Sequence, residues 1–261
     1  MNKVIKITVW CFTVAAIVVL WYFSFKSHND TTLKGVELSL IQPNERGFVV
    51  KDDEYQTIMN ICDTAHNNHL EMLPVDSVRR YVESIPWVVS SGTGLTLDGV
   101  LVVNMTECDP VMRVYNNKGE SVYLDEKGNI FPVRANYTPH VLVGSGKLNF
   151  KVPTTSSNIY DSIYDDGDFR TIFDVMKSVL NNSYSRCCVK QVYYERDNIE
   201  LVLNNAEMRV IIGDKHNIDR KLMNMKYFFD HMQGSPEMQD YSMVNFNFIN
   251  QVVCTKKIND E

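Results

Sequence analysis

The chain has 261 residues and a formal net charge of -6, with 26 lysines and arginines against 32 aspartates and glutamates. Hydrophobic residues make up 44% of the sequence and charged residues 22%, a balance typical of folded proteins that excludes wholesale disorder. The acidic balance argues against a nucleic-acid binder, because neutralising phosphates requires a surplus of lysine and arginine.

The N-terminal segment differs from the rest of the chain in composition. Ile7 to Phe25 contains no charged residue, and a helix over it would span about 28 Å, close to the thickness of a bilayer core. A cleaved signal peptide is the alternative, but residues 20–28 are too bulky for a small-residue cleavage site. We therefore predict an uncleaved transmembrane helix over residues 7–25, followed by a polar linker over residues 26–33.

The charges around this segment predict its orientation. Lys3 and Lys6 precede it, which favours a cytoplasmic tail at residues 1–6 and an exported body. Without these two lysines the chain holds 24 basic and 32 acidic residues, so the exported body is acidic. The six cysteines (Cys11, Cys62, Cys108, Cys187, Cys188 and Cys254) show no regular framework, and we infer no obligatory disulfide.

Residues 34–109 are predicted to form a small α+β domain. Apolar residues alternate from Val36 to Leu40, and two helical stripes follow, the second with Asp76 as its expected N-cap. Asp98-Gly99 indicates a hairpin turn with positive φ between two strands. The expected order is strand, helix, helix, strand, strand.

Residues 110–258 are predicted to form a mostly antiparallel β domain with two helices. Short apolar runs alternate with turn sequences such as Asn116-Asn117-Lys118-Gly119, which is typical of strand meanders. Helical periodicity predicts helices over residues 169–180 and 219–232. The expected strands are Met112–Tyr115, Ser121–Leu124, Asn129–Pro132, Val189–Tyr194, Ile199–Leu203, Met208–Ile212 and a single closing strand, Tyr241–Lys256.

An ordered series of motifs over residues 34–256 resembles the bacterial FtsQ/DivIB family, and its style most resembles the Bacteroidetes branch. Cys108 stands where the family usually has Arg, and Asn245-Phe246-Asn247 stands where Asp-Leu-Arg is usual. The matching stretches are Ser77–Val89, Leu97–Val111, Tyr123–Phe131, Pro139–Gly144, Met208–Gly213, Lys221–Met232 and Val244–Val253.

The resemblance implies the fold and the function. It implies that residues 34–109 form a POTRA-like domain, a second docking surface for other divisome components. It also implies a non-enzymatic protein of the inner membrane and division septum, anchored in the lipid bilayer through Ile7 to Phe25. Its C-terminal region would bind FtsB-like and FtsL-like partners.

The closing strand is the candidate partner-binding edge. An exposed strand edge carries unpaired N–H and C=O groups that a partner strand can bind. Even positions such as Val244 and Phe246 would face the core, and odd positions would face away. An inner strand covered by the chain itself is the alternative. The candidate residues are Val244, Asn245, Phe246, Asn247, Phe248, Ile249, Asn250, Gln251, Val252, Val253 and Cys254.

A metal site or an enzyme is the competing interpretation. Cys62, His66 and His69 have a helical spacing that suits a soft metal, but a structural zinc site usually needs four ligands and no fourth is evident. We therefore predict no metal, no cofactor and no catalytic residue. The alternative is an exported, membrane-tethered enzyme or ligand-binding domain with a weak metal site at these three residues. A POTRA-bearing outer-membrane factor would need a long barrel, for which no room remains.

Overall fold

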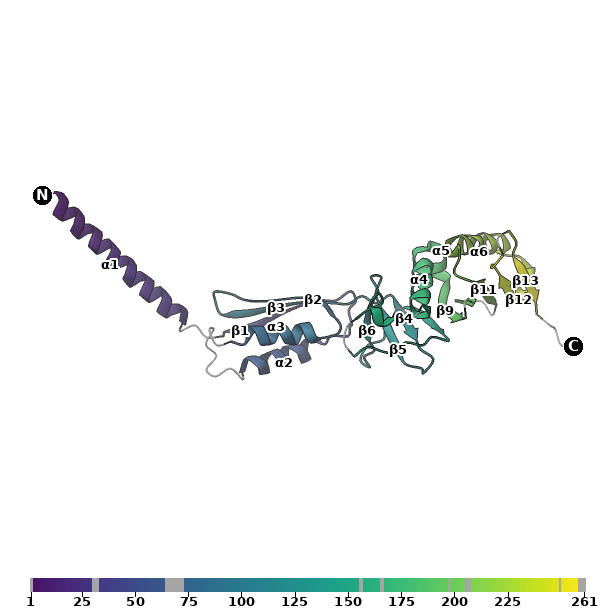
Figure 1. Cartoon of the computed structure of the whole chain (residues 1–261), viewed down its shortest axis with the longest axis horizontal. Coiled ribbons are helices and arrows are strands. Elements are labelled where there is room, and N and C mark those ends of the chain that lie inside the picture. The colour runs from purple at the N-terminus through teal and green to yellow at the C-terminus, as the bar shows by residue number, and fades with distance from the viewer. Residues whose placement is uncertain are drawn as a thin grey trace. The chain divides into compact units, whose positions relative to one another are not determined.

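A computed structural model describes residues 2–29, 33–63, 73–154, 157–164, 167–196, 198–204, 208–248 and 250–257. The chain divides into two compact units, Met1–Glu107 and Cys108–Glu261 (Figure 1). Each unit is mixed α+β, as expected from the sequence.

The first helix, α1, spans Asn2–Asn29. Its large apolar side chains are exposed, with Trp10 at 70%, Phe12 at 79% and Trp21 at 69%. Among the helices of the described residues, none is both long enough and apolar enough to cross a membrane.

The rest of the first unit has the predicted order of strand, helix, helix, strand, strand. β3 is the central strand of the sheet, parallel to β1 and antiparallel to β2. The two helices bury one stripe each, because apolar residues three and four apart lie on the same helical face. The elements are β1 (Gly35–Ile41), α2 (Lys51–Asp63), α3 (Val75–Ser84), β2 (Val88–Leu95) and β3 (Val100–Glu107).

The turns of this unit follow their local sequence, with one correction. Gly99 has φ 86° in the β2–β3 hairpin, as the Asp-Gly pair predicts. The N-cap prediction for Asp76 is wrong, because α3 begins after Pro74. Asp76 lies in the first turn instead, where its carboxylate accepts a hydrogen bond from Arg79 Nη2 at 2.5 Å. An acidic residue is favourable there because the amino end of a helix is partially positive.

The second unit contains one ten-stranded mixed sheet. Its strand order is β13-β12-β11-β10-β9-β7-β4-β5-β6-β8, with parallel pairs at β12–β11, β9–β7 and β7–β4. The strands are β4 (Met112–Tyr115), β5 (Ser121–Leu124), β6 (Asn129–Pro132), β7 (Leu142–Gly146), β8 (Ser157–Asn158), β9 (Val189–Glu195), β10 (Asn198–Leu203), β11 (Arg209–Gly213), β12 (Tyr241–Asn245) and β13 (Val253–Lys256).

Helices α4 (Asp168–Asn181), α5 (Ser183–Cys188) and α6 (Ile218–Met232) cover one face of this sheet (Figure 1). Short 3-10 helices occupy Ser162–Tyr164 and Pro236–Asp240. The helices and strands share one apolar core, in which Ile172, Phe173 and Met176 of α4 are buried against strand residues such as Val192. Packing in this core holds α6 against the sheet to which the last strands belong.

The single closing strand predicted over Tyr241–Lys256 is wrong. β12 ends at Asn245, and β13 returns antiparallel to it from Val253. The break has a local cause, because the backbone N–H of Asn247 donates to the Asn245 side-chain oxygen at 2.9 Å instead of to a neighbouring strand. Residues 246–252 therefore connect two strands of a hairpin.

Candidate partner-binding edge

β13 is the outermost strand at one end of the sheet. It pairs with β12 only, with Asn245 opposite Val253 and Met243 opposite Thr255. Val253 is 40% exposed, and the side chain of Cys254 is half-buried against the core. Among the described residues, no strand covers the outer edge of β13.

The hydrogen bond next to β13 indicates which of its amides face outward. The N–H of Lys257 donates to the carbonyl oxygen of Asp240 at 2.6 Å, so it points toward β12. Successive residues of an antiparallel strand direct their N–H and C=O groups to opposite edges. By this alternation the N–H groups of Cys254 and Lys256 point away from β12. These N–H groups face the open edge, whereas the carbonyl oxygen of Lys256 accepts a hydrogen bond from Ser242 Oγ of β12 at 3.3 Å.

Phe246 anchors the beginning of the segment that joins β12 to β13. Its side chain is 1% exposed, and its N–H donates to the carbonyl oxygen of Ile211 at 2.7 Å. Its ring lies 5.7 Å from the ring of Phe228 and 6.5 Å from that of Phe229, both on α6. The buried ring thus holds the connection against α6 and β11.

A buried lysine also forms a hydrogen bond with the segment that joins β12 to β13. Lys221 of α6 is 7% exposed, and its ammonium donates to the side-chain oxygen of Asn247 at 3.1 Å. It also donates to the carboxylate and the carbonyl oxygen of Asp214, at 2.7 and 2.9 Å. These bonds compensate the charge for its lost hydration. The hydrogen bond from Lys221 also holds the pKa of Asp214 below its ordinary value.

The eleven predicted edge residues differ in how far they are buried. Val244 and Phe246 are buried, as predicted for even positions, but Phe248 is 44% exposed and Val252 is 36% exposed. The predicted alternation fails after Phe246 because β12 has already ended at Asn245. The exposed group also includes Asn247, Asn250, Gln251 and Val253, with Asn245 and Cys254 half-buried and Ile249 outside the described residues.

Sequence analysis missed the two residues that position this segment. Asp214 and Lys221 lie 26 to 33 positions before Asn247, too far for any helical or strand periodicity to connect them. One sequence feature indicated the role of Lys221. It directly precedes Leu222 on the apolar stripe of α6, where a lysine side chain must either be buried with a partner or turn toward solvent.

The competing metal site is described only at its first residue. Cys62 is fully buried in the core of the first unit, and burial raises the pKa of its thiol. His66 and His69 lie outside the described residues. Within the described ranges, no three His, Cys, Asp or Glu side chains gather in a way that could hold a metal ion.

The second unit matches the family model described as FtsQ/DivIB, C-terminal related, over residues 109–255. The match covers more than half of the chain and runs from the residues before β4 into β13. The chain belongs to the FtsQ/DivIB family. No curated protein matches it.

Membership of the FtsQ/DivIB family makes this a divisome-associated protein whose partners are other divisome proteins. The FtsQ/DivIB family consists of non-enzymatic divisome proteins. The matched region contains the whole β12–β13 hairpin apart from the last residue of β13, so the candidate edge belongs to the family domain.

Proposed function

We propose that this chain is a membrane-anchored assembly protein of the divisome that holds FtsB-like and FtsL-like partners along the outer edge of β13 during septum formation. The partner would add a strand to the ten-stranded sheet. The observation that carries this proposal is the open edge of β13, where the alternation directs the N–H groups of Cys254 and Lys256 outward.

The surroundings of this edge suit strand addition. Main-chain hydrogen bonds would supply affinity, and alternate side chains of the partner would supply selectivity. Phe248, Val252 and Val253 are each at least one third exposed, so they provide apolar area beside the edge. The anchors Phe246 and Lys221 would hold this surface in place before the partner arrives, which lowers the entropic cost of binding.

The membrane anchor would be residues 7–25, on the α1 helix. It is supported by the absence of charge in that segment and by the exposure of Trp10, Phe12 and Trp21. Lys3 and Lys6 favour a cytoplasmic N-terminus and a periplasmic body. Alkaline extraction of membranes tests the anchor. We expect the full chain to stay in the membrane pellet, and its release into the supernatant would contradict the anchor.

The first unit would be a POTRA-like domain that docks other divisome components. Its β-α-α-β-β order and its sheet order β1-β3-β2 support this interpretation. The domain would then be a second interaction surface, separate from the β13 edge.

A proline at an outward-facing position of β13 tests the edge. Lys256→Pro removes one outward donor and leaves the amides that face β12 in place, and edge strands tolerate such prolines. We expect the full chain carrying this variant to bind co-expressed FtsB-type and FtsL-type partners about tenfold more weakly, from the lost hydrogen bond and the bulk of the ring.

Two further variants make the result interpretable. Lys256→Ala keeps the amide and should bind normally, whereas Thr255→Pro removes an amide that faces β12 and should destabilise the hairpin. Circular dichroism of each variant reports folding. If Lys256→Pro folds normally and binds both partners with unchanged affinity, partners do not use this edge.

A further inference from the structure

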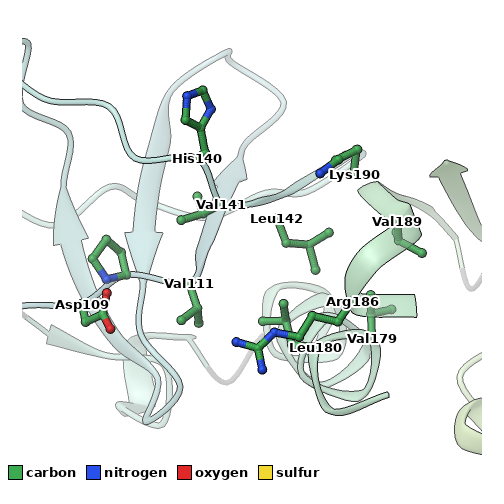
Figure 2. A pocket seen from close by; sticks show the side chains of 11 residues that line it. Asp109, Val111, His140, Val141, Leu142, Val179, Leu180, Arg186, Val189 and Lys190 are labelled. Atoms are coloured by element: carbon green, nitrogen blue, oxygen red, sulfur yellow. The ribbon is translucent and has the colours of Figure 1, made fainter. Parts of the chain in front are cut away.

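A pocket of about 490 Å³ lies in the second unit, far in sequence from the β13 edge. It opens where the parallel strands β4, β7 and β9 begin and where α4 ends. Val111, Leu142, Val179, Leu180 and Val189 form its floor, and the side chains of Leu142 and Leu180 are seen there in Figure 2.

Charged and titratable side chains surround this apolar floor. Arg186 of α5 extends from the helices toward the side of Val111 and Asp109, Lys190 lies at the start of β9, and His140 lies before β7 (Figure 2). All four are exposed. Two permanent positive charges and one negative charge therefore line this pocket, in a chain whose overall balance is acidic.

The two cations are unneutralised. Within the described ranges, neither the guanidinium of Arg186 nor the ammonium of Lys190 forms a hydrogen bond or an ion pair. Other exposed cations of the same unit do have partners, such as Arg209 with Glu200 at 2.7 Å. The cations at this pocket are thus available to an external anion.

The arrangement suits a peptide rather than an enclosed small ligand. Small-molecule sites bury most of the ligand and place fixed polar groups inside the cavity. Here the floor is apolar and every charged group lies on the exposed rim, which is the pattern of a protein interface with an apolar centre and a polar rim. An apolar side chain can fill the floor while neighbouring carboxylates meet Arg186 and Lys190.

We propose that this pocket binds an acidic segment of a partner protein, in which an apolar side chain enters the floor and adjacent Asp or Glu residues pair with Arg186 and Lys190. This surface is separate from the β13 edge and does not depend on it. It would allow the second unit to hold two segments at once, which raises overall avidity.

Peptide selection on the full chain in detergent micelles tests this proposal. The probe is a displayed library of nine-residue peptides with a fixed central leucine and random flanks. We expect the selected flanks to be enriched in Asp and Glu, and the synthetic winner to bind in fluorescence anisotropy. Replacing its acids by lysine should weaken binding about tenfold, with a smaller effect at high salt.

Charge reversal at the rim gives the decisive comparison. Arg186→Glu/Lys190→Glu should weaken the acidic peptide about tenfold and favour the lysine version. Lys127→Glu, an exposed change in the β5–β6 turn, should leave binding unchanged. Three results would each overturn the proposal. The first is acidic enrichment that persists when the double variant is used for selection, and the second is a selection without acidic enrichment. The third is that the selected peptides no longer bind the Lys256→Pro variant. Failure of the β13 edge alone would leave peptide binding at the pocket intact.

Discussion

The ammonium of Lys221 donates a hydrogen bond to the side-chain oxygen of Asn247 at 3.1 Å, so a buried charge on α6 holds the segment that leads to the outermost strand. The same ammonium is bound by Asp214, just after β11. One ammonium group therefore connects α6, the residue after β11 and the segment between β12 and β13, beside the proposed partner edge.

Removal of this cation should destabilise the second unit. Lys221→Met keeps most of the side-chain volume but leaves Asp214 and Asn247 without their donor. We expect the free energy of unfolding to fall by about 2 kcal/mol, the scale of hydrogen bonds to a charged group. Chemical denaturation followed by circular dichroism measures it. Lys226→Met, which breaks an exposed pair with Asp230 at 3.8 Å, should change stability by no more than ~0.5 kcal/mol. Equal effects from the two variants would contradict this role of Lys221.

The Lys221–Asp214 pair should also make stability depend on pH in the acid range. The pKa of Asp214 is lowered in the folded protein, chiefly by the hydrogen bond from Lys221, so its unfolded form binds protons more readily. The stabilisation is complete above the unfolded pKa of about 3.9 and is lost as pH falls through the lower folded pKa. Asp214→Asn should therefore lose less stability than the parent chain between about pH 5 and pH 2. Identical pH profiles would show that the pair does not contribute.

Two glycines with similar backbone conformations allow the effect of backbone strain to be distinguished from the effect of a side-chain clash. Gly213 has φ 75° and Gly119 has φ 81°, so alanine at either position costs about 1 kcal/mol of backbone strain. A Cβ at Gly213 would also overlap the side chain of Asn247, whereas at Gly119 it would meet open space. We expect Gly213→Ala to be the more destabilising and to weaken partner binding, while Gly119→Ala leaves binding unchanged. Thermal melts measure the stability, and binding to the co-expressed FtsB-type and FtsL-type partners measures the second effect. Normal partner binding by Gly213→Ala would show that the position of Asn247 does not matter to the edge.

A buried carboxylate organises the loop after β1 in the first unit. Glu107 is 4% exposed and accepts hydrogen bonds from the N–H of Phe48 at 2.5 Å, the N–H of Val49 at 3.3 Å and the side chain of Gln42 at 2.6 Å. Glu107→Gln places a donor against these donors, which costs about 1–3 kcal/mol. We expect hydrogen exchange in peptides covering residues 42–50 to become about tenfold faster. Glu83→Gln, an exposed change on α3, is the control, and unchanged exchange in Glu107→Gln would contradict the assignment.

Local patterns predicted most elements because the forces that form them act over a few residues. Short apolar runs between turn sequences identified β4, β5 and β6, and the turn at Asp98-Gly99 follows from the positive φ that glycine permits. The same reasoning failed at Phe248, where alternation continues in sequence after the strand has ended. The hydrogen bond from Asn247 N–H to the Asn245 side chain ends it, and Asn-x-Asn spacing does not by itself reveal which partner that amide will take.

The sequence by itself determined the element types, the uncharged segment at Ile7 to Phe25 and the family to which the chain belongs, because these depend on local periodicity, composition and motif order. Only the tertiary structure decided that β13 is the outermost strand, that Lys221 reaches Asn247, and that Arg186 and Lys190 line one pocket with apolar residues. Each of these depends on strand order and on side chains brought together by the shared core, and no local pattern specifies that order.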